Sequence, residues 1–240
     1  MKDIKTSIDV RRKEDAFHTR IPWLDSRHCF SFGGHYDPDN THHGLLLVSN
    51  DDTVRAGTGF STHPHRDMEI VTWVLEGELE HKDSEGHKGL LYPGLAQRMS
   101  AGTGIWHSEM NPSGDKDVHF VQMWVPPDTE SVKPAYEQLD VNGELAKGGL
   151  VPIASGKGHG AAISIRQKDA ALWGGRIKPG ASVRVPDAKN VHLYVAKGAV
   201  DLEAAGTLET GDSARLVAAG TPKLTADATR GAEVLIWETV

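Results

Sequence analysis

Cysteine is nearly absent from the chain, since Cys29 is the single thiol among 240 residues. One thiol excludes an intramolecular disulfide and argues against the disulfide-rich scaffolds of small secreted proteins. Long apolar runs are also missing, because none approaches the ~20 residues of a membrane-spanning helix. Residues 1–17 contain no apolar segment typical of a signal peptide. We therefore expect a cytoplasmic protein with no membrane partner.

Positive charge is the minority sign in this chain. The 33 acidic residues outnumber the 26 basic ones, and no Lys/Arg cluster is long enough to form a phosphate-binding stripe. Nucleic acid is therefore not expected as a direct partner. Hydrophobic residues at 38% and charged residues at 25% are typical of a globular protein. The length suffices for two ordinary domains, and we expect two.

Apolar segments are short and are separated by turn-forming residues. The run Leu45–Val48, for example, lies between the turn-rich segments Asp37–Asn40 and Asn50–Asp52. Short strands joined by frequent turns predict an all-β architecture.

Two pairs of metal-binding residue types stand two positions apart. His63 is followed by His65, and His107 by Glu109. Side chains at i and i+2 of a strand point to the same face. Two such strands facing one another in a small barrel or sandwich would bring three imidazoles and one carboxylate together. Such a set suits a divalent transition metal.

A further carboxylate follows the first pair. Counting by two from His63 reaches His65, Asp67 and then Glu69. An uninterrupted strand would therefore direct Glu69 into the same interior as the histidines, whereas a β-bulge would break that inference. We expect Glu69 to lie near the site.

Six other histidines are predicted to stay off the metal, because they are adjacent in sequence, lie among charged residues or stand alone. These are His42 and His43 in a loop, His81 and His87 as exposed residues at a hairpin tip, His159 in a loop, and His192 in a strand.

Motifs around the two pairs resemble those of a known family. The spacing G-x5-H-x-H-x3-E-x7-G at 57–77 resembles the first cupin motif, and G-x-G-x2-H-x3-N at 102–111 resembles the second, with Gly102 in place of the usual proline. The segments THPHRDMEIVTWVLEG and MSAGTGIWHSEMNPS are more narrowly similar to the pirin family of the cupin superfamily. Within that family the resemblance is to the bacterial pirin-like quercetin 2,3-dioxygenases.

The resemblance implies a ligand set and a cofactor. The ligands of pirins fall here on His63, His65, His107 and Glu109, while the position of Glu69 is left off the metal. The implied cofactor is one divalent transition metal ion. Iron is expected, although imidazole and carboxylate ligands are also compatible with Mn, Ni, Cu or Zn. Trp106 departs from the resemblance, because bacterial relatives often carry a basic residue there, and this bears on the identity of the substrate.

The second half of the chain resembles a diverged repeat of the first. Val195–Gly198 resembles Val74–Gly77 at an offset of 121 positions. At the same offset from His63 and His65 stand Arg184 and Pro186, which are not a ligand pair. The expected fold is an all-β bicupin with two β-sandwich or barrel (jelly-roll) domains. We place the metal-binding cupin domain at 1–140 and a metal-free cupin-like domain at 141–240.

The activity implied by the resemblance is that of a metal-dependent dioxygenase. Such an enzyme cleaves a flavonol such as quercetin with O2 and releases carbon monoxide. Glu109 is the nearest group able to accept the substrate proton, and Glu69 is the competing candidate for the catalytic base. The alternative is a redox-responsive regulatory or protein-interaction protein that binds metal without turnover, as in eukaryotic pirin. The sequence does not identify a protein partner.

Overall fold

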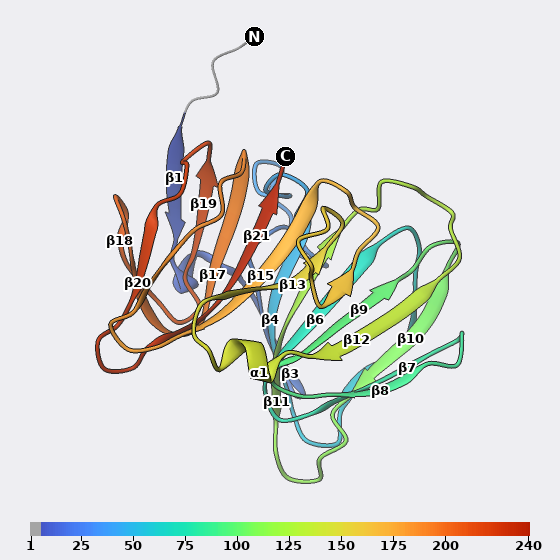
Figure 1. Ribbon diagram of the computed structural model, residues 1–240. Helices are drawn as coiled ribbons and strands as arrows, with labels where there is room; N and C mark the ends of the chain where they lie inside the picture. The colour runs from blue at the N-terminus through green and yellow to red at the C-terminus, as the bar shows by residue number, and fades with distance from the viewer. Residues whose placement is uncertain (1–5) are drawn as a thin grey trace.

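The computed structural model describes residues 6–240, which are almost entirely β-structure (Figure 1). In the first half, a seven-stranded antiparallel sheet has the order β12 (Ala135–Asp140), β9 (Leu95–Ser100), β6 (Glu69–Glu76), β11 (Val118–Val125), β4 (Val48–Val54), β3 (Leu24–His28) and β2 (Phe17–Ile21). A four-stranded sheet covers its inner face, in the order β5 (Gly59–His65), β10 (Ile105–Met110), β7 (Leu79–Asp83) and β8 (Lys88–Leu91).

The second half repeats this layered arrangement. Its large sheet has the order β1 (Ser7–Arg11), β19 (Ser213–Val217), β17 (Asn190–Leu202), β21 (Ala232–Thr239), β15 (Ala170–Ile177), β13 (Leu150–Ser155) and β14 (Ile163–Ser164). The far end of β17 continues into a second layer with β16 (Ser182–Arg184), β18 (Gly206–Glu209) and β20 (Lys223–Ala226). The predicted all-β architecture with two sandwiches is confirmed.

Helical structure is limited to short connections. The 3-10 turn η1 spans Lys13–Asp15, and α1 spans Asn142–Leu145 between the two halves. No helix within residues 6–240 has the length and apolar character needed to cross a membrane.

The predicted domain limit at residue 140 coincides with the end of β12, and the next strand, β13, belongs to the other large sheet. The first strand departs from the predicted division. β1 pairs with β19, with Ser7 opposite Val217 and Arg11 opposite Ser213, so residues 7–11 form the edge of the second large sheet. The interval 1–140 therefore does not form one self-contained structural unit.

Strand pairing reproduces the repeat that the sequence indicates. β6 lies between β9 and β11, as β17 lies between β19 and β21. Gly77 directly follows β6 and Gly198 lies at the equivalent place within β17, with φ of +76° and +75°. A Cβ at these positions would lie 2.7 Å and 2.1 Å from the carbonyl oxygens of Asp117 and Gly231, so both positions require glycine.

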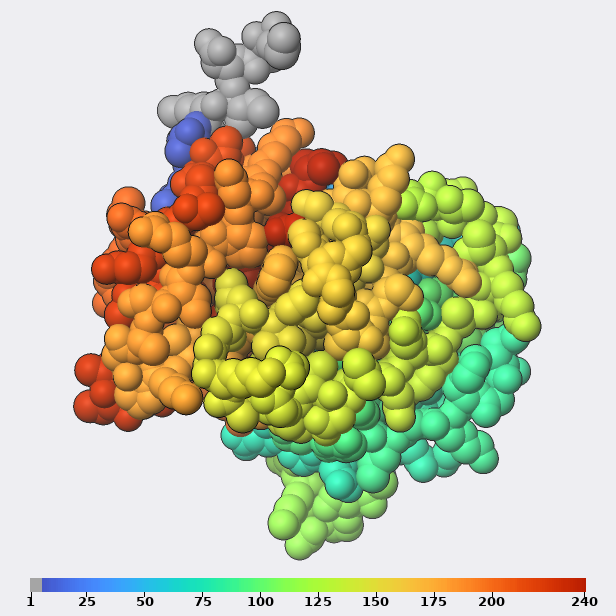
Figure 2. Space-filling model, viewed as in Figure 1, coloured from blue at the N-terminus to red at the C-terminus, as the bar shows by residue number. Residues whose placement is uncertain are grey.

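The two large sheets pack against each other through a shared apolar cluster, and the halves meet along a broad front in Figure 2. From the first sheet it includes Val71, Trp73 and Met123, and from the second Leu235 and Trp237. Because β6 is covered on both faces, seven of its eight residues are buried. This explains why its sequence is apolar without alternation.

We expect Trp237→Ala to lower the free energy of unfolding by about 3–5 kcal/mol, because it leaves a cavity in the shared cluster. Trp237 is 1% exposed. Trp106→Ala is the matched control, since Trp106 is 54% exposed and its loss should change stability by less than ~0.5 kcal/mol. Guanidinium chloride unfolding followed by circular dichroism measures both. Equal effects of the two substitutions would contradict a cluster that holds the halves together.

Candidate metal centre

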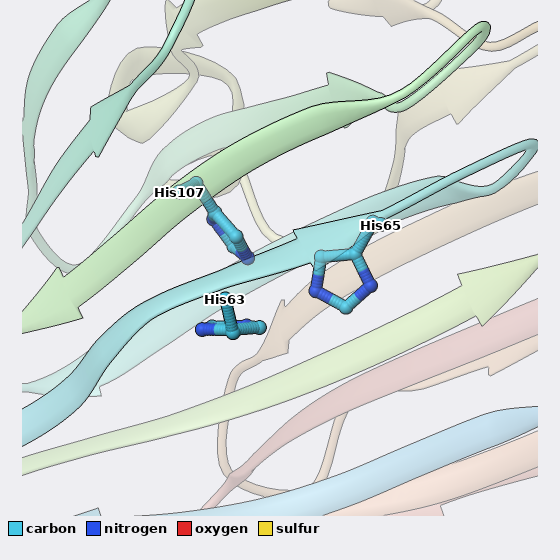
Figure 3. A group of neighbouring side chains, drawn as sticks. All are labelled: His63, His65 and His107. Atoms are coloured by element: carbon cyan, nitrogen blue, oxygen red, sulfur yellow. The ribbon is translucent and has the colours of Figure 1, made fainter.

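Three imidazoles meet where β5 lies beside β10. His63 is directly opposite His107 in the antiparallel pair, and His65 is opposite Ile105. The ring centroids of His63 and His107 are 4.4 Å apart, and those of His65 lie 4.9 Å from both. One nitrogen from each ring lies within 4.8 Å of the other two, and Figure 3 shows the rings converging from the two strands. The expectation that these histidines face one interior is confirmed.

Nitrogen lone pairs in this cluster lack hydrogen-bond partners. The Nε2 atoms of His65 and His107 are buried and have no partner among the described residues. His63 donates its Nδ1–H to the carbonyl oxygen of Ser61 at 2.8 Å, which leaves its Nε2 lone pair available. Leaving a buried polar atom unpaired costs about 1–3 kcal/mol. The residues present therefore fit a metal ion, whose binding would satisfy these nitrogens.

Burial also sets the charge state of the cluster. Desolvation, with the neighbouring histidines, lowers the pKa of His65 to about 4 and that of His107 to about 3. Both rings are therefore neutral at pH 7, which is the form that binds a metal.

Glu109 lies beside the three imidazoles. It is buried on β10 on the same side as His107, in agreement with the i+2 spacing. Both of its oxygens accept hydrogen bonds of 2.8 Å from the side-chain amide of Gln122, and Gln122 in turn accepts one of 3.0 Å from the Trp124 indole. Among residues 6–240, the donor atoms converging within 4.8 Å belong to the three histidines, and the carboxylate of Glu109 is not one of them.

Glu69 faces away from the histidines, so the expectation that it shares their interior was wrong. β5 ends at His65, and the chain then turns through Asp67, with φ of +45°, into β6 of the opposite sheet. Strand alternation does not carry across that turn. The Glu69 carboxylate instead accepts hydrogen bonds from the Ser100 hydroxyl at 2.8 Å and the Arg166 backbone N–H at 3.1 Å.

His81 was predicted to be exposed at a hairpin tip, and this was wrong. It is 1% exposed on β7, with its Nδ1 atom 3.4 Å from Nδ1 of His107. Its Nε2 atom lies 3.2 Å from Oδ2 of Asp83. His87 does lie near the tip, with its side chain partly exposed. The i+2 spacing of His81 and Asp83, on either side of Lys82, was the available signal.

The other histidines predicted to stay off the metal lie outside the cluster. His42 is exposed and His43 half-buried in the loop before β4, where Nε2 of His43 lies 3.1 Å from the carbonyl oxygen of Leu216. His159 is in an exposed loop and His192 is buried in β17. In the second sandwich, β16 and β20 pair as β5 and β10 do, but neither strand carries a histidine.

A cavity of about 630 Å³ opens beside the cluster and includes His63, His65 and Glu109 in its wall. Aromatic side chains form much of the rest, among them Trp23 and Phe60, whose rings meet edge to face at 5.1 Å. Cavities of this size and apolar lining commonly bind small organic molecules.

Polar side chains that the sequence did not single out line another part of the cavity. Ser26 donates its hydroxyl to the buried carboxyl of Asp52. Burial raises the pKa of Asp52 to about 7. His28 lies nearby, with its Nδ1–H directed at the Asn50 side-chain oxygen at 2.9 Å. These groups could hydrogen-bond a polar substituent of a ligand.

Comparison with known families assigns both halves of the chain. The family model described as Pirin matches residues 10–125, and that described as Quercetinase C-terminal cupin domain matches residues 152–239. A Mycobacterium tuberculosis protein provisionally named a quercetin 2,3-dioxygenase is 55% identical over 233 residues, or 97% of this chain and 95% of that protein. The Escherichia coli K12 protein named quercetin 2,3-dioxygenase is 50% identical over 131 residues, or 55% of this chain and 57% of that protein.

Solved structures agree with this assignment. The crystal structure of the Escherichia coli bacterial pirin YhhW in complex with nickel(II) superposes with a TM-score of 0.88 at 35% identity, over 97% of this chain and 99% of that one. The sequence motifs, the paired sandwiches and the two family matches lead to one conclusion. The chain belongs to the pirin family of the cupin superfamily.

Proposed function

We propose that this protein is a metal-dependent dioxygenase that cleaves flavonols such as quercetin with O2 and releases carbon monoxide. The observation that carries the proposal is the convergence of three imidazoles beside an aromatic cavity, with His63 and His65 in its wall. The names of its relatives support the same chemistry. A cytoplasmic location remains a prediction from the sequence.

The residues proposed to hold the metal are His63, His65, His107 and Glu109. All four donors are nitrogen or oxygen, which is compatible with iron, manganese, nickel, copper or zinc. Iron is our expectation, and nickel is the ion named for YhhW. When bound, such an ion lowers the pKa of a coordinated hydroxyl and holds two reactants together.

The cavity supports a planar aromatic substrate. Trp23, Phe60 and Trp124 offer apolar ring faces, and Ser26 with Asp52 offers hydrogen bonds to a hydroxyl group. A substrate packed against these side chains would displace water from the reacting atoms and strengthen the electrostatic interactions among them.

Glu109 is the proposed acceptor of the substrate proton. Its oxygens are in the cavity wall, and the Gln122 amide holds them in place at 2.8 Å. Glu69 is not proposed for this role, because its carboxylate is bonded to Ser100 and the Arg166 backbone.

Replacing His63, His65 or His107 by Ala should abolish stoichiometric metal binding, because each change removes one of three converging imidazoles. Metal analysis of purified, iron-reconstituted protein by mass spectrometry measures this. His42→Ala is the control, since His42 is an exposed loop residue outside the cluster. Full retention of metal in any one of the three variants would refute the ligand assignment.

The two glutamates should behave differently when each is replaced by Gln. Glu109→Gln should reduce both metal content and flavonol turnover, since it alters a ligand and the proton acceptor together. Glu69→Gln should keep the metal and stay within a few fold of wild-type turnover. A loss of about 10²–10⁴-fold in Glu69→Gln, with metal content and melting temperature unchanged, would identify Glu69 as the base after all.

The reaction itself is tested by mixing the metal-loaded protein with excess quercetin without oxygen and then admitting air. We expect the flavonol absorbance to disappear over many turnovers, with carbon monoxide released in equal amount to the quercetin consumed. Metal-stripped protein is the control. Bleaching limited to one equivalent, with no carbon monoxide, would instead favour the regulatory metal-binding protein.

A further inference from the structure

Behind His107 lies a buried row of polar side chains that does not line the cavity. His81 and Asp83 come from β7, which pairs with β10 so that Asp83 is opposite His107 and His81 is opposite Glu109. Nδ1 of His107 is 3.4 Å from Nδ1 of His81, whose Nε2 is 3.2 Å from Oδ2 of Asp83. The side chains of His81 and Asp83 are 1% and 0% exposed, so water does not compete for these contacts.

Asp83 is fixed by its own turn. Its Oδ1 accepts the backbone N–H groups of Glu85 at 3.0 Å and of His87 at 2.9 Å. Its Oδ2 is therefore the oxygen that faces His81, and it also lies 3.0 Å from Nδ1 of His87. Nδ1 of His87 also lies 3.2 Å from Oδ1, so the two oxygens differ in that Oδ1 accepts the two backbone N–H groups and Oδ2 faces His81.

The hydrogen atoms in this row follow from donor and acceptor chemistry. A carboxylate only accepts, so His81 must carry its hydrogen on Nε2 to bond with Asp83. A neutral imidazole protonated at Nε2 has a bare Nδ1, which can only accept. Nδ1 of His107 must then carry the hydrogen between the two rings. Its Nε2 is left with a lone pair directed at the metal centre, and this is the buried atom that lacks a partner.

We propose that Asp83, acting through His81, fixes the tautomer of His107 so that Nε2 is available to the metal. His81 and Asp83 are positioning residues in this proposal. The Ser61 carbonyl oxygen has the same effect on His63, where it accepts the Nδ1–H at 2.8 Å. Outer partners of this kind orient metal-binding histidines and select the nitrogen that binds. The proposal rests on metal binding by His107 and not on flavonol cleavage.

Asp83→Asn keeps nearly the same side-chain size. It should reverse donor and acceptor in both hydrogen bonds, the one between residue 83 and His81 and the one between His81 and His107. The backbone N–H groups of Glu85 and His87 require an acceptor at the Oδ1 position, so the amide oxygen must lie there. The amide NH2 group then occupies the Oδ2 position and donates to Nε2 of His81. His81 must now donate from Nδ1 to His107, which forces the hydrogen of His107 onto Nε2 and blocks that nitrogen.

The test uses nitrogen-15 NMR of histidine-labelled, metal-free protein, together with nickel affinity measured by chelator competition. In the wild type we expect hydrogen on Nδ1 of His107 and on Nε2 of His81. Asp83→Asn should move the His107 hydrogen to Nε2 and weaken nickel binding by about 10–100-fold. His87→Gln is the control, because His87 contacts Asp83 but lies outside the route from Asp83 to His107, and it should leave both readouts unchanged.

Two results would overturn the proposal. One is a wild-type His107 that carries its hydrogen on Nε2, or a His81 protonated on both nitrogens, and this requires no variant to fold. The other is a folded Asp83→Asn protein with wild-type tautomers and nickel affinity within about twofold. Neither readout involves flavonol turnover, so failure of the proposed dioxygenase activity would leave both results interpretable.

Discussion

The arrangement of the first sandwich depends on bringing three imidazoles close together with their nitrogens largely shielded from water. Each ring contributes a nitrogen that could bond to water or protein if it were exposed, yet Nε2 of His65 and of His107 has no partner in the described chain. Holding polar atoms in this way opposes folding by about 1–3 kcal/mol each. The packing around the site must supply that free energy until an ion does. The small sheet that carries the site, with β5 at its edge, therefore relies on the seven-stranded sheet for support.

That support comes from both directions. Strands β6 and β11 pack inward against the small sheet that carries the histidines, and outward against the second sandwich. Val71 and Trp73 therefore lie in the cluster shared with Trp237, while Thr72, between them, lies 3.5 Å from the Glu109 carboxylate. The second half has a structural role in this view, because it covers the outer face of the sheet against which the site is built.

Strand alternation predicted much of this site from the sequence, and its failures have a physical cause. Within β5 and within β10 the i+2 rule placed His63 with His65 and His107 with Glu109 on one side, because each pair lies on a single strand. The rule failed for Glu69, because the chain changes sheets between His65 and Glu69 and the sequence shows no interruption there. The polar part of the cavity wall around Ser26 and Asp52 could not be predicted from the sequence either. Asp52 reaches it only through the register of β4 against β3.

The error on His81 has another origin. Its neighbours Glu80 and Lys82 are charged and point outward, and a run of charged residues predicts exposure for every member of the segment. Alternation places His81 and Asp83 on the opposite, buried face. His107 is oriented by β7, Glu109 by Gln122 of β11, and His63 by the backbone of its own strand. Because these supports come from both sheets, a small shift of one sheet against the other would move the proposed ligands by different amounts. The geometry of the candidate metal centre is therefore tied to the packing of the two sheets.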